Sequence, residues 1–104
     1  MSQTPKTVTI PLEEPIQRGE QKIDKLTLRR PQAGELRGVR LAELTNGDVG
    51  AVLAVLPRIS SPTLTPTEAA ELDPVDLAAA TSEIIGFFMT KQLRQEVEAR
   101  KSSY

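Results

Sequence analysis

The sequence has no cysteine and no histidine, and its aromatic side chains are few: two Phe, one Tyr and no Trp among 104 residues. Without cysteine the chain can form neither a disulfide nor a thiolate metal site. Without histidine it lacks the commonest general base and metal ligand. These absences exclude most of the familiar catalytic and metal-binding constellations. We therefore expect no enzymatic activity, no cofactor and no metal ion.

Long apolar segments and an excess of one charge are also missing. Apolar runs stay far below the roughly 20 residues that a membrane-spanning helix needs, and the N-terminus has no signal-peptide core. Thirteen Lys and Arg stand against fourteen Asp and Glu, which gives a formal net charge of -1. Such a balance is not the basic surface that nucleic-acid binding needs. We therefore expect a cytoplasmic protein that binds no membrane and for which nucleic acid is not the favoured partner.

Residues 7–30 show the two-residue period of β-strands. An apolar side chain stands at every second position in a first segment and again in a second one, at Val8, Ile10, Leu12, Leu26 and Leu28. Gly19-Glu20, between the two segments, is a link typical of antiparallel neighbours. The pattern predicts an antiparallel β-hairpin or a small meander over residues 7–30, and residues 1–6 ahead of it are expected to be disordered.

Two irregularities are expected inside this hairpin. Glu13-Glu14-Pro15 is rich in turn residues and is expected to turn the chain. The apolar face also changes parity between Ile23 and Leu26. One extra residue near positions 24–25, a β-bulge, would return both side chains to the same face of the sheet. The first strand is therefore expected to stop before residue 13, and the second one to bend.

From residue 35 onward the apolar spacing changes to three and four residues, which is the period of an α-helix. Helices are predicted over residues 36–44, 49–56, 66–72 and 74–100. Pro57 is expected to end the second of them, and Thr45 or Asn46 to accept hydrogen bonds from its first turn. The loop that follows is predicted at residues 60–62.

The two later helices have strong start signals, and the last one is expected to carry much of the core. Thr65-Pro66 and Asp73-Pro74 each place an N-cap side chain before a proline at the first helical position, and Glu68 closes a capping box. In the last helix a wide arc is predicted to face the core, namely Leu77, Ala80, Thr81, Ile84, Ile85, Phe87 and Phe88. Strands placed before helices predict an α+β fold in a single domain, with three or four helices between residues 35 and 100 and the last one long.

Four arginines lie near the change from strand to helix: Arg29, Arg30, Arg37 and Arg40. They could form a phosphate or nucleic-acid patch, but only one Tyr is available for stacking on bases. We favour a solvated strand end whose charges keep the sheet edge from pairing with another chain. The nearest carboxylate pairs, Glu13-Glu14 and Asp73 with Asp76, favour caps and solvent exposure over a metal or acid–base site.

Beyond Phe88 the last helix is expected to change character. Met89, Leu93 and Val97 continue at four-residue spacing, on a stripe that is turned away from the arc facing the core. Charged residues surround this stripe. Residues 89–104 are therefore either a projecting helical tail with a narrow apolar seam or a frayed end. We predict that Met89, Leu93 and Val97 bind a partner, either a second copy of the chain or an amphipathic helix of another protein.

Several short segments, taken in order, resemble a known family. They are Leu28-Arg29-Arg30-Pro31, then Ala33-Gly34-Glu35-Leu36-Arg37-Gly38 with Leu41, then Leu56-Pro57-Arg58-Ile59-Ser60, Thr63-Leu64-Thr65 and Leu72-Asp73-Pro74-Val75-Asp76-Leu77. This order is similar to that of the small tail assembly chaperones of contractile-tailed phages and prophages, over about residues 5–90. No single segment is chemically diagnostic, so the resemblance rests on order and spacing.

The resemblance implies a non-enzymatic chaperone of the host bacterial cytoplasm. Such a protein would bind the long helical tape measure protein, keep its apolar surface from aggregating and help tail tube subunits assemble around it. The implied partners are the tape measure protein and the tail tube protein, beside a homo-oligomer. On the residues alone a second function stays open: a small regulatory or antitoxin-like protein that uses its arginines on nucleic acid or on an acidic partner.

Overall fold

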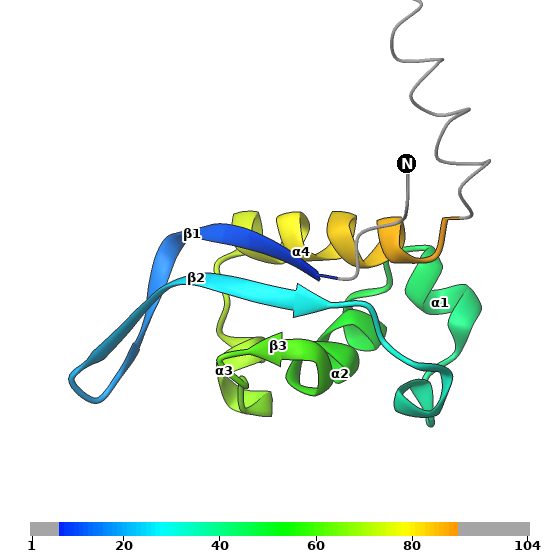
Figure 1. The fold of residues 1–104 in the computed structure, drawn as a ribbon, viewed down its shortest axis with the longest axis horizontal. Helices are drawn as coiled ribbons and strands as arrows, with labels where there is room; N and C mark the ends of the chain where they lie inside the picture. The colour runs from blue at the N-terminus through cyan, green and yellow to red at the C-terminus, as the bar shows by residue number, and fades with distance from the viewer. Residues whose placement is uncertain (1–6, 90–104) are drawn as a thin grey trace, which may run out of the picture.

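The computed structural model describes residues 7–89, which form an α+β fold (Figure 1). β1 (Thr7–Arg18) and β2 (Gln21–Arg29) make an antiparallel hairpin, and β3 (Ser60–Ser61) pairs antiparallel with β2, so that the sheet order is β1-β2-β3. The helical elements are a 3-10 helix η1 (Ala33–Leu36), α1 (Leu41–Thr45), α2 (Val49–Ile59), α3 (Pro66–Ala70) and α4 (Pro74–Phe87). The predicted fold class, with a hairpin ahead of the helices and a long last helix, is confirmed.

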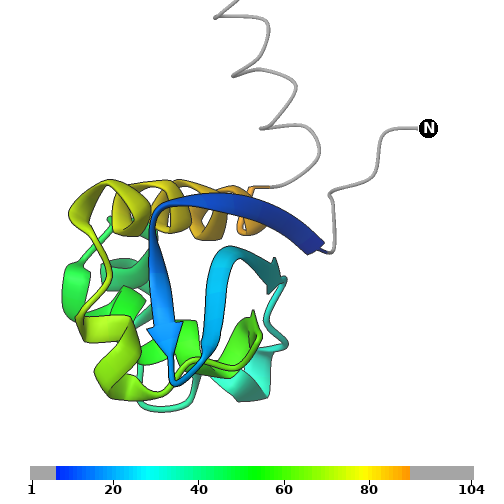
Figure 2. The ribbon, with the colours of Figure 1, turned by 90° about the vertical axis from the view of Figure 1, so that its left-hand side faces the viewer.

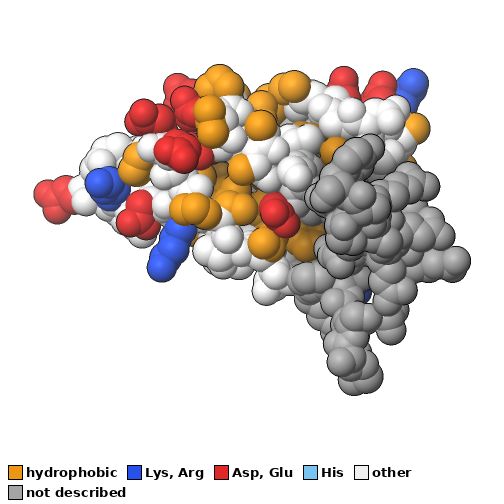
Figure 3. Space-filling model, turned by 90° about the horizontal axis from the view of Figure 1, so that it is seen from above, with side chains coloured by type: hydrophobic (Ala, Val, Ile, Leu, Met, Phe, Trp, Pro, Cys, Tyr) orange, Lys and Arg blue, Asp and Glu red, His pale blue; other side chains and the backbone are white. Residues whose placement is uncertain are grey.

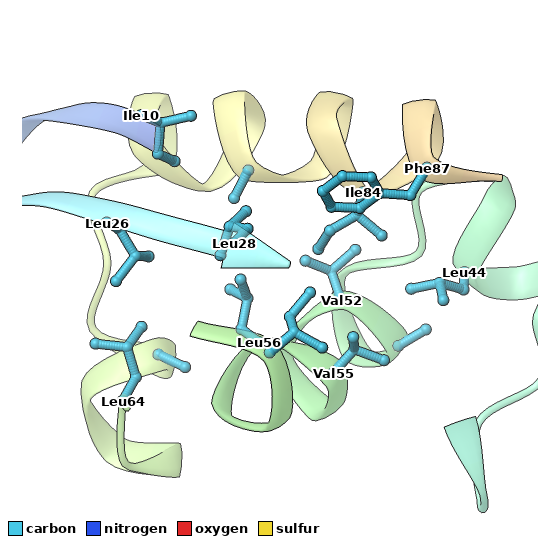
Figure 4. Close-up of a cluster of buried hydrophobic side chains, with 14 of the residues drawn as sticks. Ile10, Leu26, Leu28, Leu44, Val52, Val55, Leu56, Leu64, Ile84 and Phe87 are labelled. Atoms are coloured by element: carbon cyan, nitrogen blue, oxygen red, sulfur yellow. The ribbon is translucent and has the colours of Figure 1, made fainter. Parts of the chain in front are cut away.

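The sheet lies between helices. α4 runs along β1 on one side of the molecule, and α2 and α3 lie on the other side (Figures 1 and 2). Side chains from the sheet and from both helical layers point toward one another in the space between them (Figure 4). Four that meet there, Leu28, Val52, Leu56 and Ile84, are each 0% exposed. The described residues therefore share one hydrophobic core, which β2, α2 and α4 build together.

The hairpin turns at Gly19-Glu20, as predicted. Arg18 pairs with Gln21 across the turn, so the loop has two residues. Gly19 has a φ of +59°, a left-handed conformation that glycine adopts without steric cost and that two-residue hairpin turns require.

A wide bulge interrupts the pairing of the two long strands. Between Pro11 and Ile16, β1 advances five positions, whereas the paired residues of β2 advance only two, from Lys25 to Ile23. The bulge lies where the parity change predicted an irregularity, but the extra residues belong to β1. The turn predicted at residues 13–15 is wrong, because these residues lie inside β1 and form the bulge.

The helix predicted over residues 36–44 is wrong. Arg37 is extended, with φ -58° and ψ 136°, and Gly38 has a φ of +80°. Neither conformation can continue a helix, so η1 ends at Leu36 and α1 begins only at Leu41. The apolar spacing was genuine, since Leu36 and Val39 still contact the core.

The boundaries of α2 also differ from the prediction. Asp48, rather than Thr45 or Asn46, caps it, accepting a hydrogen bond from the Ala51 amide at 3.0 Å. Pro57 does not end it, because a proline in the last turn removes one donor only, and the helix continues to the buried Ile59. The loop predicted at residues 60–62 contains β3.

The start signals of α3 and α4 are confirmed. Thr65 and Glu68 form the predicted capping box, and Asp73 accepts a hydrogen bond from the Val75 amide at 3.0 Å. The C-terminal boundary is wrong. α4 ends at Phe87 and not near residue 100, since the amides of Phe88 and Met89 bond three residues back, in the tighter pattern that closes a helix. The disorder predicted for residues 1–6 falls outside the described residues, as do residues 90–104 of the tail predicted for 89–104.

Candidate functional site

Of the four arginines of the predicted patch, Arg29 alone makes side-chain hydrogen bonds within residues 7–89, and it does so together with Arg58. The Arg29 guanidinium forms a two-pronged ion pair with the Glu35 carboxylate, one bond of which is 2.6 Å long, and it also donates to the Arg58 carbonyl at 2.9 Å. The Arg58 guanidinium in turn donates to the carbonyls of Glu35 and Arg37, at 2.7 and 2.9 Å. These bonds fasten the end of β2 and the segment around η1 to the end of α2. Arg58, which the sequence analysis did not single out, is central to the joint.

The other three arginines of the predicted patch have different surroundings. Arg30 lines a shallow, open pocket together with Pro31, Gln32 and Ala33. Arg37 and Arg40 are exposed, and Arg40 occupies the N-cap position of α1. None of the three side chains forms a hydrogen bond or ion pair within residues 7–89. Arg29 is paired with Glu35, so an anion site built from all four arginines would have to break this ion pair. The patch and the regulatory alternative stay predictions.

A second ion pair ties the hairpin to α3. Arg18 donates to both carboxylate oxygens of Glu68, at 2.7 and 3.0 Å, and to the Thr63 carbonyl at 2.9 Å. Glu68 also accepts from the Thr65 amide at 2.9 Å. The hydrogen bonds from Arg18 and from the Thr65 backbone lower the pKa of Glu68 to about 2. Likewise, the hydrogen bonds from Arg29 and from the Gln32 backbone lower the pKa of Glu35 to about 2.

These lowered pKa values predict a specific loss of stability in acid. A carboxyl group whose pKa falls from 4.5 to about 2 on folding stabilises the fold above pH 4.5, and it loses this contribution as the pH falls towards 2. We expect the variant Glu35→Gln/Glu68→Gln to be less stable than the parent at pH 7, and the difference to shrink between pH 4.5 and 2. Urea unfolding at several pH values measures this difference.

The control for this experiment is Glu20→Gln, which removes an exposed carboxylate from the hairpin turn. It should change the urea midpoint little at any pH. A parent and a double variant whose midpoints stay equally far apart from pH 7 down to pH 2 would show that the two ion pairs do not cause the acid sensitivity.

Asp76 is a buried carboxylate that accepts hydrogen bonds from the bulge of β1. Its side chain is 1% exposed. Oδ1 accepts a hydrogen bond from the Glu13 amide at 2.7 Å, and Oδ2 accepts one from the Glu14 amide at 3.1 Å. The bulge leaves these amides without a partner in β2, and the first turn of α4 supplies one. The carboxylate is thus used for structure, and within residues 7–89 no group of three or more acidic, His or Cys side chains could hold a metal ion.

Only the first residue of the partner-binding stripe predicted at Met89, Leu93 and Val97 lies among the described residues. Met89 is half-buried and lies just after the end of α4. Leu93 and Val97 lie outside the described residues. The prediction placed all three on one unbroken helix, and that helix ends at Phe87. The stripe therefore stays a prediction.

The structure draws attention to an exposed side of α4 that the sequence analysis missed. Val75 is 60% exposed, and Ala78 and Ser82 are also exposed. With steps of three and four residues, they lie on the side opposite the buried Ala80 and Ile84. We call Val75, Ala78 and Ser82 the outer face of α4. The absence of charge between Asp76 and Glu83 is the sequence signal that could have found it.

The chain is similar to known proteins over most of its length. Within the described part of the chain no helix is long and apolar enough to cross a membrane. The family described as phage tail assembly chaperone proteins, E, or 41 or 14, matches residues 9–89, nearly the whole described fold. No solved structure matches the chain.

Two proteins of Escherichia phage P2 are similar to the chain. Tail assembly protein E is 47% identical over 78 residues, which are 75% of this chain and 86% of protein E. Tail assembly protein E' is 45% identical over 82 residues, which are 79% of this chain but only 58% of E'. The chain thus spans less than two thirds of the length of E'. The family match and both relatives agree: the chain belongs to the phage tail assembly chaperone family.

Proposed function

We propose that this protein is a non-enzymatic chaperone that binds the tape measure protein of its phage and promotes assembly of the tail tube around it. It would act in the cytoplasm of the host bacterium, before the tail is complete. The observation that carries this proposal is the family match over residues 9–89, which includes the hairpin, the bulge and α4. The lack of Cys and His in the chain agrees with a binding role.

The proposal is tested by producing the tape measure protein of the same tail gene cluster with and without this protein. We expect the tape measure protein to aggregate when produced alone, and to stay in solution and be captured with the tagged chaperone when both are present. A tape measure protein that aggregates to the same extent in both cases and is never captured would contradict the proposal.

The same assay examines the predicted site at Met89, Leu93 and Val97. The variant Leu93→Asp/Val97→Asp is expected to reduce capture of the tape measure protein at least tenfold if this stripe is used, because carboxylates oppose burial of an apolar seam. The matched control is Gln92→Asp/Gln95→Asp, which adds the same charge at neighbouring positions. Light scattering on both variants reports whether the stripe holds a homo-oligomer instead. Equal capture and equal mass for the two variants would exclude the stripe as an interface.

A further inference from the structure

α4 has one side that faces the core and an opposite side that carries no charge. Its buried side is formed by Asp76, Ala80, Ile84 and Phe87. The opposite side is the outer face, where no residue is charged. The outward side of a helix on a protein surface usually carries charged and polar residues. Among the described residues, however, nothing covers the outer face, since Val75 remains 60% exposed.

The outer face lies between two fixed borders. On one side the turn at Gly47, which has a φ of +80°, lies so close to α4 that a Cβ at this position would be 3.5 Å from the Thr81 methyl and 3.8 Å from Ile85 Cδ1. Two residues further on, Val49 is 54% exposed, and it adds apolar surface beside this border. On the other side β1 is held to α4 through Asp76.

The outer face has the shape that a second helix needs. The outer face runs from Val75 to Ser82, so it is about 10 Å long at 1.5 Å per residue, and it reaches about 15 Å with Ile85. The small side chains of Ala78 and Ser82 lie along its middle, and larger apolar side chains, Val75 and the half-buried Ile85, lie toward its ends. Helices pack at interaxial distances of about 8–10 Å, and the short distances require small side chains at the contact.

The charge around this face is of one sign. Along α4 itself the charged residues are Asp76 and Glu83, and Asp73 caps its first turn, whereas Glu68 lies on α3 and is paired with Arg18. Glu13 and Glu14 stand next to the start of α4, because their amides bind Asp76. Figure 3 shows this side of the molecule, with hydrophobic side chains gathered beside a group of acidic ones and few basic ones.

The sign of the charge decides between two kinds of occupant. If the outer faces of two copies met, the acidic side chains beside the face, Glu83 among them, would approach those of the other copy, and like charges oppose such a contact. A helix that carries Lys or Arg beside its apolar stripe is attracted instead.

We infer that the outer face of α4 is the docking surface for an α-helix whose apolar stripe is flanked by Lys and Arg. This inference rests on the proposed function, because the partner that supplies the helix is the tape measure protein. It places the contact on the folded body of the chaperone, independently of the stripe predicted at residues 89–97.

The first test uses Ala78→Glu in the full chain and measures capture of the tape measure protein. We expect capture to fall at least tenfold, because Glu at the centre of the face adds both bulk and a repelling charge. The matched control is Ala54→Glu, the same substitution at an exposed position of α2, a helix on the other side of the sheet (Figure 1). Circular dichroism and thermal unfolding confirm that both variants remain folded.

The second test addresses charge. Glu83→Lys should weaken capture several-fold and reduce its sensitivity to salt, whereas Glu20→Lys in the hairpin makes the same charge change and should leave both unchanged. Equal capture by Ala78→Glu and Ala54→Glu would overturn the inference and leave the proposed function intact. A change in the mass of the chaperone with capture unaltered would also overturn it, as it would assign the face to a second copy. If the parent protein captures nothing, the proposed function itself fails.

Discussion

Replacing Asp76 with Ala is expected to lower the free energy of unfolding by about 3 kcal/mol, since hydrogen bonds to a charged group contribute roughly 1.5–3 kcal/mol each and two are lost. The amides of Glu13 and Glu14 would lose their acceptors at 2.7 and 3.1 Å. No strand partner is available to them, because β1 bulges away from β2 at this point. For a domain of this size the melting temperature should fall by about 15 °C.

Two further variants show whether the hydrogen bonds between Asp76 and the bulge of β1 cause this loss of stability. Asp73→Ala removes a single cap bond in the same turn of α4 and should cost about 1 kcal/mol. Asp76→Asn keeps the shape of the side chain but presents an amide group to one of the two amides, so it should lie between the other two variants. Urea unfolding measures the free energy of unfolding of all three variants, provided that its dependence on urea concentration is the same for each. An Asp76→Ala variant no less stable than Asp73→Ala would mean that water replaces the carboxylate at the bulge.

Replacing Ile84 with Ala is expected to lower the free energy of unfolding by about 3 kcal/mol, as large-to-small changes in a packed core do. Ile84 is 0% exposed, and it points from α4 toward Leu28 and Val52 (Figure 4). The cavity would open between α4 and the sheet, where the surrounding side chains are held by two other elements and cannot easily move in. Thermal and urea unfolding both report the change.

The adjacent residue supplies a matched control with the same chemistry. Ile85 is only half-buried and contacts the turn at Gly47, so Ile85→Ala should cost about 1 kcal/mol, in proportion to the smaller area withdrawn from water. Equal losses for the two variants would show that Ile85 is covered in solution, for instance by a bound partner. That outcome would support the inferred docking surface, because Ile85 lies at its border.

Local signals in the sequence predicted local structure well. The capping box of Thr65 with Glu68, the cap at Asp73 and the turn at Gly19-Glu20 depend only on residues a few positions apart, and all three form. The two-residue period of the hairpin also holds. Of the predicted core arc of α4, Ala80, Ile84 and Phe87 are buried and Leu77 and Phe88 pack against the core, whereas Thr81 and Ile85 are only half-buried. Each of these features is decided within one or two turns of chain.

Failures arose where a backbone conformation or a distant contact decided the outcome. The spacing around Leu36 suited a helix, but nothing local revealed that Gly38 would adopt a positive φ. Pro57 was expected to end α2, yet the buried Ile59 and the bonds of Arg58 hold the last turn in place. Arg58 itself could not be identified, because the carbonyls that accept its hydrogen bonds lie far away along the chain.

The candidate site was predictable only in part for the same reason. The arginine patch was identified by composition, but its ion pair with Glu35 appears only in three dimensions. The sequence shows that α4 has an uncharged side. It does not show which apolar residues of the helix face the core, because the position of the sheet decides that. The family, by contrast, could be inferred from the sequence alone, because the resemblance rests on the order of segments along the chain.

The hydrogen bonds from the bulge of β1 to Asp76 also bear on the order in which parts of the chain fold. The strands of the hairpin are joined by two residues and can meet early, whereas Glu13 and Asp76 are separated by 63 positions, and a contact across so long a loop forms at a greater entropic cost. The curvature of β1 is therefore final only after α4 has been made and has docked. Until then the bulge amides of Glu13 and Glu14 would lack the acceptor that Asp76 supplies. The bulge of β1 would therefore be the last part of the hairpin to take its final shape.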